Sequence, residues 1–489
     1  MIEPQQDVLC FSWSVCQWIQ REDVILKMWK RSVALVVILL LTLSTAPAAS
    51  AQVPFVGMGD SIGEGVQSGD ASESTQPFNF LNLIALRLGT SFPLPLIRTG
   101  IFGIVGDTSS RSRINPNVAG LDLAVSGADV SSILRDRADA TSPALINSET
   151  DLVLFPRLGS QIEIAESLRP NLVACWIGNN DVLGAVTSFD QMDVSQMTSI
   201  SDFYVAFVEL ATRLNAMNSK VVYGTIPDVG SIGFLVDRNF LISKFGTDLG
   251  LPATSRTSIV TVLLIGIGIL DPSVIQNPNF VLDAAELSAI SQRIDIFNQI
   301  IFAVANYFGQ GVADLHTRFD QFITTPPVVL GVPLTHTFLG GLFSLDGVHP
   351  SDIAHAFIAN EFITAFNTTY GLNIPLIDPS FLAYLFITDP FVDLNANGRV
   401  RGRPFVGLLE TVSLLLRFSG DVETFSPGAT IAEATASKGK TLISDEAKEK
   451  FFDKYKKMKG KDLRKVSKQE AMDAFREIFG LDRFKKKHR

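Results

Sequence analysis

The chain has 489 residues, of which 46% are hydrophobic and 35 are phenylalanine, and its formal net charge is −9. This length is sufficient for two or three domains and a large buried core. The charge is uneven, because residues 438–489 hold 18 basic and 9 acidic side chains, which leaves −18 on the rest of the chain. An acidic body disfavours nucleic acid as the main partner, since binding to the phosphate backbone needs a concentrated positive surface.

The first 51 residues have the pattern of a secretory signal peptide. Met28-Trp29-Lys30-Arg31 supplies a positive start, residues 33–43 an apolar core, and Ala49-Ser50-Ala51 the small residues before Gln52. An uncleaved membrane anchor is disfavoured, because the apolar run is shorter than the roughly 20 residues that span a bilayer. We expect the true start at Met28, cleavage before Gln52, and a secreted or periplasmic protein.

Cysteine use sets a further limit. Cys10 and Cys16 precede the expected cleavage site, so Cys175 alone remains in the mature chain. No intramolecular disulfide is then expected, and stability has to come from the core. Cys175 lies in the apolar run 172–177, which favours a buried strand residue over a nucleophile.

Strand and helix patterns alternate between residues 53 and 315. Strands are predicted at 53–58, 120–125, 172–177, 220–226 and 311–315, and helices at 78–88, through 134–137, and at 203–217 and 299–308. Such alternation indicates a parallel sheet that is covered by helices on both faces. We therefore expect a three-layer α/β/α domain over residues 52–375, with a mainly parallel sheet of about five strands and its site at the carboxyl ends of those strands.

Two segments interrupt this alternation and are interpreted as insertions, one near 91–117 and one near 231–287. The second contains IVTVLLIGIGIL at 259–270, a run without charge. This run is too short to span a bilayer. We expect a buried helix or strand there in preference to a lid that contacts a lipid-like substrate.

The pattern changes after about residue 375, and residues 376–436 form an extension of uncertain character. Asp393, Asn395 and Asn397, followed by Gly398, match the first half of a calcium loop. The twelfth position of such a loop holds a bidentate acid, but here it is Pro404. A plain Asx/Gly turn is therefore favoured over a calcium site.

Residues 437–489 are predicted to be a basic helical tail, and its first residues, 437–440, form a polar linker. Helices are expected at 445–459 and 468–479, the second opened by a capping box of Ser467 and Glu470. Their lysines favour a solvated face. Attraction to an anionic envelope surface is the alternative.

The stretch Gly59-Asp60-Ser61-Ile62-Gly63 follows the first predicted strand and can be interpreted in two ways. As G-x-S-x-G it fits the nucleophile elbow of α/β-hydrolases, and as G-D-S plus an aliphatic residue it fits another esterase family. A serine nucleophile needs a base. The chain has five histidines, at positions 316, 336, 349, 355 and 488. His349 stands in an irregular Gly/Pro segment, with Asp346 close enough to accept from its Nδ1–H.

Four segments, taken in order, resemble the motif blocks of the GDSL family of lipases and esterases, also called SGNH hydrolases. They are Gly59-Asp60-Ser61-Ile62, Leu123-Ala124-Val125-Ser126-Gly127-Ala128, Gly178-Asn179-Asn180-Asp181 and Asp346-Gly347-Val348-His349-Pro350. The resemblance covers about residues 52–370, and Ile62 replaces the leucine of the motif.

This resemblance implies a flavodoxin-like fold and a reaction without metal or cofactor. It also implies Ser61 as the nucleophile, His349 as the base and Asp346 as its acid partner. The expected oxyanion donors are the backbone N–H groups of Ser61 and Gly127 and the side-chain amide of Asn180, not that of Asn179.

The position of Ser61 distinguishes the two interpretations of the opening stretch. An α/β-hydrolase has several strands before its elbow, whereas Ser61 is the tenth residue after the expected cleavage site and has room for only one. The GDSL interpretation is therefore favoured, with Gly63 as a turn residue without a catalytic role.

We predict a secreted serine esterase or lipase that acts on a small-molecule or lipid ester. Abundant phenylalanine and the apolar insertions favour acyl chains as substrates. Two alternatives stay open: a carbohydrate O-acetylesterase with the same catalytic residues, and an envelope-binding protein that acts through its basic tail. The sequence gives no prediction of oligomeric state.

Overall fold

The computed structural model describes residues 53–99, 108–394, 400, 443, 445–479 and 481. All of these residues belong to one compact unit. The predicted signal peptide, the linker at 437–440, and Asn395 and Asn397 of the calcium-loop motif lie outside the described residues. In the part that is described, no helix is long and apolar enough to cross a membrane.

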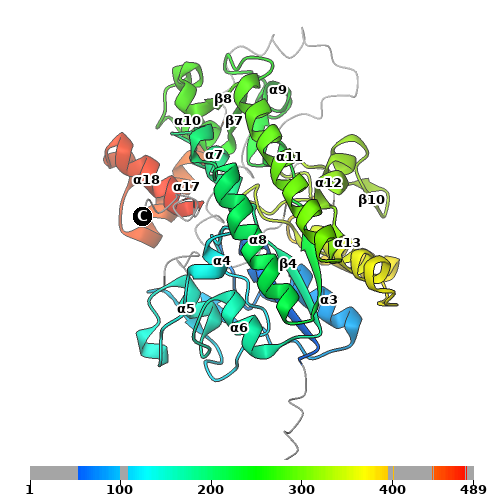
Figure 1. The fold of residues 1–489 in the computed structure, drawn as a ribbon. Helices are drawn as coiled ribbons and strands as arrows, with labels where there is room; N and C mark the ends of the chain where they lie inside the picture. Colours follow the sequence, from blue (N-terminus) through cyan, green and yellow to red (C-terminus); the bar gives the residue numbers. More distant parts are fainter. Residues whose placement is uncertain are drawn as a thin grey trace, which may run out of the picture. The chain divides into compact units, whose positions relative to one another are not determined.

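A four-stranded parallel sheet forms the centre of the fold (Figure 1). Its strands, in spatial order, are β1 (Phe55–Gly59), β4 (Leu172–Trp176), β5 (Lys220–Gly224) and β9 (Gly311–Ala313). All three pairings are parallel, so the carboxyl ends of the strands meet at one edge. The predicted α/β/α class is confirmed, and over the described part of the chain the sheet has four strands where about five were predicted.

The segment 120–125, predicted as a strand, does not form one. It runs beside β1, where the Leu123 N–H donates to the Gly57 carbonyl at 2.9 Å, but a single bridge joins Gly57 to Asp122. The Asp122 carboxylate accepts the Ala124 N–H at 3.1 Å. The N–H groups of Leu123 and Val125 donate to β1, so the Ala124 N–H faces away from that strand and has the Asp122 carboxylate as its acceptor instead.

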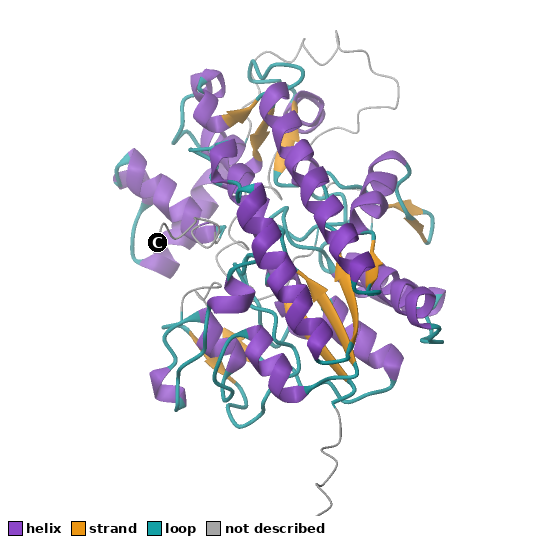
Figure 2. Cartoon of the chain, viewed as in Figure 1, coloured by secondary structure: helices purple, strands orange, loops and turns teal. Residues whose placement is uncertain are grey.

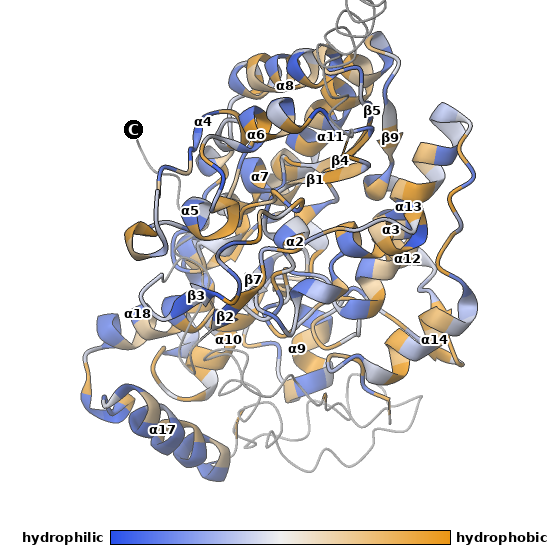
Figure 3. Cartoon of the chain, turned by 90° about the horizontal axis from the view of Figure 1, so that it is seen from below, coloured by the Kyte–Doolittle hydropathy of each residue, from blue (hydrophilic) through white to orange (hydrophobic). Residues whose placement is uncertain are grey.

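Helices cover both faces of the sheet (Figures 2 and 3). On one face lie α8 (Ile200–Ala216) and α11 (Ala284–Tyr307), which pack side by side. On the other face α3 (Phe80–Leu88) packs against α13 (Asp352–Tyr370), which also contacts β5 and β9.

Side-chain caps set the starts of three of these helices. Ser199, Asp283 and Ser351 precede α8, α11 and α13, and each accepts an N–H from the first turn. The helices predicted at 78–88 and 203–217 are confirmed. The one predicted at 299–308 is the last part of α11, which has 24 residues.

Both predicted insertions have structure of their own. The first contains the antiparallel pair β2 (Ile97–Thr99) and β3 (Arg111–Arg113). The second contains a three-stranded antiparallel sheet of β6 (Leu235–Asp237), β7 (Arg256–Ser258) and β8 (Val281–Leu282).

The apolar run at 259–270 forms α10 (Ile259–Gly266), and all eight residues of this helix are buried. The expectation of a buried helix or strand therefore holds for these residues.

Shorter elements connect these parts, and the segment predicted as a helix through 134–137 is one of them. They are α2 (Ser61–Glu64), η1 (Gln76–Phe78), α4 (Ser132–Arg135), η2 (Pro143–Leu145), α5 (Glu149–Leu154), α6 (Gln161–Leu168), α7 (Asn180–Thr187), η3 (Val194–Gln196), η4 (Val229–Ser231), α9 (Arg238–Phe245), η5 (Pro272–Gln276), η6 (Pro278–Phe280), α12 (Leu315–Thr324), β10 (Val328–Val329), β11 (Val332–Pro333) and α14 (Pro379–Thr388).

The tail contains the two expected helices, α17 (Asp445–Lys459) and α18 (Lys468–Ile478), with η7 (Leu463–Lys465) between them. The capping box of Ser467 and Glu470 is present. α17 is mainly hydrophilic in Figure 3, and several of its lysines pair with nearby carboxylates. These pairs fit the expected solvated face.

Candidate active site

Ser61 lies where the buried strand β1 ends and the short helix α2 begins. Asp60 caps that helix, because its Oδ1 accepts the Ile62 N–H at 3.0 Å. Ser61 is the first helical residue, so its own N–H has no acceptor inside the helix. The turn therefore places the hydroxyl and the N–H of one residue together at the carboxyl edge of the sheet.

His349 and Asp346 come from the loop before α13 and meet Ser61 across almost 290 residues of sequence. His349 Nε2 lies 2.8 Å from Ser61 Oγ, and His349 Nδ1 lies 2.7 Å from Asp346 Oδ2. All three side chains are buried. When Nδ1–H donates to the carboxylate, Nε2 is left to accept the serine proton. The structure thus brings together the three residues that sequence analysis selected, in hydrogen-bond order.

The Asp346 carboxylate is held by several further donors. Its Oδ1 accepts the N–H groups of Val348 at 2.9 Å and His349 at 2.8 Å, and the Ser344 hydroxyl at 3.1 Å. Its Oδ2 accepts the Gly69 N–H at 3.0 Å. These bonds leave the carboxylate little freedom to turn, so the orientation of the imidazole is fixed as well.

Gly69 belongs to the turn at 66–70, directly after α2, and sequence analysis gave this turn no role. Ser68 exchanges two bonds with the loop of the base: its N–H donates to Ser344 Oγ at 2.8 Å, and its Oγ accepts the Leu345 N–H at 3.1 Å. Gln67 adds a bond to Asp352 Oδ1 at 2.8 Å. The segment that follows the nucleophile therefore supports the loop that carries the base. No motif spacing could have shown this, because the partners are about 280 residues apart.

Three donors were expected for an oxyanion, and they lie on three different segments. Gly127 adopts a φ of +79°, a conformation that favours glycine. Asn180 opens α7, and its Nδ2 donates one hydrogen to the Ala128 carbonyl at 2.8 Å, which leaves the second hydrogen for a ligand. Within the described residues, no acceptor is bound to the N–H of Ser61 or of Gly127.

Asn179, the neighbour that was not chosen as a donor, has a different partner. Its Nδ2 donates to Asp60 Oδ2 at 2.9 Å. Burial raises the pKa of Asp60 to about 6, although its bonds to Asn179 and Ile62 oppose the shift. Asn179 therefore supports the cap of α2, while Asn180 keeps a hydrogen available.

Gly63 does not have the predicted role of a turn residue. It lies inside α2, and a Cβ at this position would lie 2.5 Å from the Cβ of Ala124. Glycine is needed because the helix approaches the segment 122–126 so closely. The apparent G-x-S-x-G pattern thus reflects packing and not an elbow.

A pocket opens beside the three residues and has almost entirely apolar walls. Its empty space is about 850 Å³, counting the part that is open to solvent. The polar residues that line it are Asp60, Ser61, Asn179, Asn180, Arg318 and His349. The walls include Leu183, Val229, Ile232, Leu315, Phe319, Phe322, Leu342, Phe343, Phe357 and Ile358. No sequence motif indicates these wall residues, because they come from several separate elements.

Other residues considered from the sequence lie away from this centre. Cys175 is a buried residue of β4, as expected, and burial raises the pKa of its thiol well above the ordinary range. His355 lies in the first part of α13, whereas His349 lies in the loop before that helix. Asp393 is described, but its two partners in the calcium-loop motif are not, so that motif stays a prediction.

The chain matches one family model, described as GDSL-like lipase/acylhydrolase, over residues 55–362. This match covers more than half of the chain and includes all the segments that meet around Ser61. No curated protein sequence matches the chain.

Several solved structures are similar to this chain. An α/β hydrolase enzyme, LAE5, from the metagenome of Lake Arreo, Spain, has 17% identity and a TM-score of 0.32, over 66% of this chain and 98% of that one. An acetylxylan esterase from Geobacillus stearothermophilus has 13% identity and a TM-score of 0.31, over 66% and 96%. A putative GDSL-like lipase from Parabacteroides merdae has 12% identity and a TM-score of 0.30, over 64% and 95%. Likenesses of this size carry no argument about function.

Proposed function

Because the chain belongs to the GDSL-like lipase/acylhydrolase family and is a carboxylic ester hydrolase, we propose that Ser61, His349 and Asp346 hydrolyse esters by two-step acyl transfer. The hydrogen-bonded series from Ser61 Oγ through His349 to Asp346 is the observation that carries this proposal. Serine is a weak nucleophile until a base takes its proton, and His349 Nε2 is in position to do so.

In the first step His349 takes the hydroxyl proton as Ser61 Oγ forms a bond to the ester carbonyl carbon. The carbonyl oxygen becomes an oxyanion, which accepts from Ser61 N–H, Gly127 N–H and the free hydrogen of Asn180 Nδ2. Collapse of this intermediate breaks the bond to the alcohol, which leaves with the proton from His349. Asp346 stays ionised throughout and stabilises the imidazolium.

In the second step water attacks the acyl-enzyme and gives a proton to His349. The same donors receive the second oxyanion. The acid leaves, and Ser61 regains its proton from the imidazole. The sequence of bonds needs no cofactor, because each proton released in one step is returned in the next.

We further propose that the acyl part of the substrate is a hydrocarbon chain and not an acetyl group. The support is the pocket, whose apolar walls include Phe319, Phe322 and Phe357. An acetyl group would leave most of these walls without a partner. Each methylene buried there contributes about 0.8 kcal/mol, which corresponds to about a fourfold gain in kcat/KM.

A chain-length series of p-nitrophenyl esters tests both proposals, with acetylated polysaccharide measured beside it. For the wild type we expect kcat/KM to rise from acetate to medium chains, with little release of acetate from polysaccharide. Ser61→Ala should abolish turnover while the protein stays folded. The acyl proposal is wrong if acetate is the best substrate, and the mechanism is wrong if Ser61→Ala keeps near-normal turnover.

Secretion is a separate proposal and depends on the pattern at residues 28–51. The charged start, apolar core and small residues before Gln52 support export with cleavage. N-terminal sequencing of the mature protein tests it. The expected first residue is Gln52, and a mature protein that retains residues 28–51 would contradict cleavage.

The basic tail is proposed to act apart from ester hydrolysis, as an attachment to an anionic envelope surface. Its support is the net charge of +9 over residues 438–489. Removal of these residues should leave kcat unchanged and lower the fraction of protein bound to envelopes. If the bound fraction is unchanged, the proposal that the tail attaches the protein to an envelope surface is wrong.

A further inference from the structure

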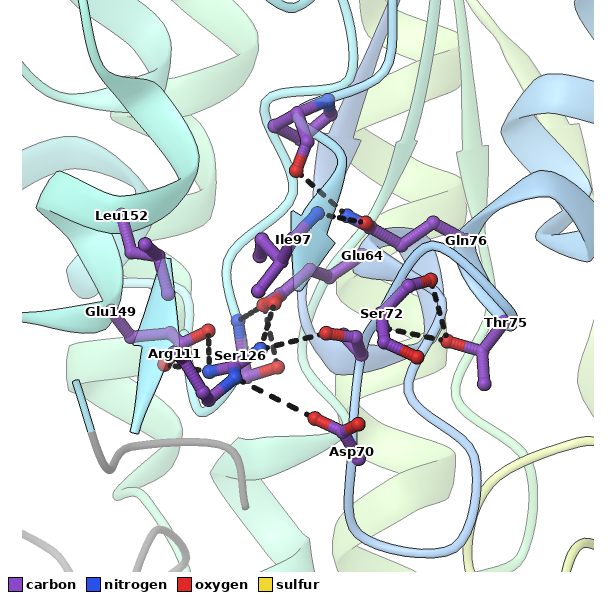
Figure 4. Close-up of polar contacts among 12 residues, drawn as sticks. Glu64, Asp70, Ser72, Thr75, Gln76, Ile97, Arg111, Ser126, Glu149 and Leu152 are labelled. Carbon is purple, nitrogen blue, oxygen red and sulfur yellow. Dashed lines mark hydrogen bonds and ion pairs between the residues drawn. The ribbon is translucent and has the colours of Figure 1, made fainter. Parts of the chain in front are cut away.

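Glu64 ends α2, three residues after Ser61, and is fully buried. Its Oε2 accepts both the N–H and the hydroxyl of Ser126, each at 2.6 Å (Figure 4). Ser126 directly precedes Gly127. One carboxylate of the nucleophile helix therefore holds the residue before an expected oxyanion donor.

A buried arginine faces the same carboxylate. Arg111, in β3, has a fully buried side chain, and its Nη2 lies 3.6 Å from Glu64 Oε1. It also lies 3.5 Å from Asp70 Oδ1, through Nε, and 2.5 Å from the Glu149 carboxylate, through Nη1 (Figure 4). We call Glu64, Asp70, Arg111 and Glu149 the Arg111 cluster. A buried carboxylate is costly unless it is paired, so Arg111 allows Glu64 to be present at this position.

The turn at residues 125–128, which Glu64 holds through Ser126, is fixed by hydrogen bonds at both ends. At its start, Ser126 is bound twice by Glu64. At its end, the Ala128 N–H donates to the Val125 carbonyl at 3.1 Å. The peptide between them belongs to Gly127, and a glycine peptide turns at little cost when its neighbours are free. The direction of the Gly127 N–H therefore depends on the bonds at both ends.

We propose that Glu64, held by Arg111, is a positioning residue that keeps the Gly127 N–H directed at the oxyanion. This inference rests on the proposed function, in which Gly127 is an oxyanion donor. Glu64 does not touch substrate in this account. It acts through Ser126. Its effect is to stabilise the transition state, in which the negative charge develops on the carbonyl oxygen.

The protonation state of Glu64 guides the choice of variants. Burial raises the pKa of Glu64 well above its usual range, and the neighbouring Glu149 charge adds to the shift while Arg111 opposes it. Glutamine has the same shape and keeps an oxygen that can accept both bonds from Ser126. Alanine has neither this shape nor an oxygen that could accept the two bonds from Ser126.

The test compares Glu64→Ala with Glu64→Gln in the full-length protein, on one p-nitrophenyl ester. We expect Glu64→Ala to lower kcat about 10- to 100-fold with KM within about threefold, because ground-state binding is unaffected. The kcat of Glu64→Gln should stay within about fivefold of the wild-type value. A purely structural role would instead lower stability in both variants without this split between kcat and KM.

Arg113→Met is the matched control. Arg113 is also buried in β3, but it donates to backbone carbonyls of residues 118, 152, 153 and 155 and not to Glu64. Its loss should lower the melting temperature and leave kcat of the folded fraction within about threefold. The proposal is overturned if Glu64→Ala keeps wild-type kcat, or if both variants lose kcat in proportion to stability.

Two further variants, Ser126→Ala and Ser61→Ala, complete the test. If Glu64→Ala does not fold, Ser126→Ala removes one of the two bonds, and a fall in kcat of about three- to tenfold at constant KM supports the proposal, while an unchanged kcat overturns it. Ser61→Ala is measured in the same assay. An active Ser61→Ala variant defeats the proposed function, whereas an inactive one beside a normal Glu64→Ala variant defeats only this inference.

Discussion

The two sides of Ser61 differ in how completely their hydrogen bonds are made within the protein. On the base side, Asp346 accepts from His349, Gly69 and neighbouring loop residues. On the donor side, within the described residues, the N–H groups of Ser61 and Gly127 have no bound acceptor. The base is thus fixed before substrate arrives, while donors are left open where negative charge appears during the reaction.

Replacing the base should have the largest effect. His349→Gln has a similar volume and keeps a polar side chain in the buried site, but it cannot take the proton of Ser61. We expect kcat to fall by about 10⁶-fold, as the loss of the base does in other serine hydrolases. Steady-state kinetics measures the fall and thermal unfolding checks the fold. A variant with more than a hundredth of wild-type kcat would mean that another group is the base.

The next largest effect should come from Asp346→Asn. The new amide would place N–H hydrogens toward the Gly69 N–H and the imidazole Nδ1, both of which now donate to Oδ2. His349 should then take the tautomer with N–H on Nε2, which cannot accept the serine proton, and kcat should fall by about 10⁴-fold.

Ser344→Ala is its control, because the Ser344 hydroxyl donates to the same carboxylate at 3.1 Å. The other bond, from the Ser344 N–H to the His349 carbonyl at 2.8 Å, belongs to the backbone and remains in the variant. It should lower kcat by less than about tenfold. Equal losses in the two variants would show that the tautomer of His349 is not what Asp346 controls.

On the donor side, Asn180→Ala should lower kcat by about 10²- to 10³-fold with little change in KM. Asn179→Ala provides the comparison, since the Asn179 amide binds Asp60. It should cost less than about tenfold in kcat. If the two variants lose equal activity, the assignment of Asn180 as the donor fails.

The smallest expected effect is on the free energy of unfolding, and it comes from Asp60, the residue before Ser61. The pKa of Asp60 is about 6, against 3.8 for a free aspartate, so the folded state keeps a proton that the unfolded chain releases as the pH rises through this interval. The contribution of Asp60 to stability therefore falls between about pH 4 and pH 6 and is constant above it.

Asp60→Asn should remove this loss of stability with rising pH, because asparagine does not titrate. Among the described residues, the buried Oδ1 of Asn179 has no hydrogen-bond partner, so the Asn179 amide can turn and accept from the new side chain. We expect a gain on the order of 2 to 3 kcal/mol at pH 7.5 and little or none at pH 4. Urea denaturation at both pH values measures it, and an equal change at both would exclude titration of Asp60 as the cause.

Much of the fold and of the reacting centre could be predicted, for local reasons. The alternation of apolar strands and capped helices gave the α/β/α class, and the resemblance to GDSL hydrolases is confirmed by the family match. Ser61, Asp346 and His349 could be selected because each lies in a short motif beside a predicted strand end or loop.

What could not be predicted depends on contacts between distant segments. The segment 120–125 joins β1 by a single bridge and not as a strand, and Gly63 is needed by a close approach to Ala124 and not by a turn. The support from Gly69, the cluster around Arg111 and the phenylalanine walls of the pocket are likewise tertiary. None of them has a fixed spacing in the sequence that would have indicated its role.

Covalent labelling tests the central claim most directly. The wild-type protein is incubated with an alkyl fluorophosphonate, and the modified residue is located by peptide mass mapping. The account predicts one label, on Ser61, with a rate at least a thousandfold lower in His349→Gln. Inactivation with the label on another residue, or full activity with Ser61 modified, would contradict it.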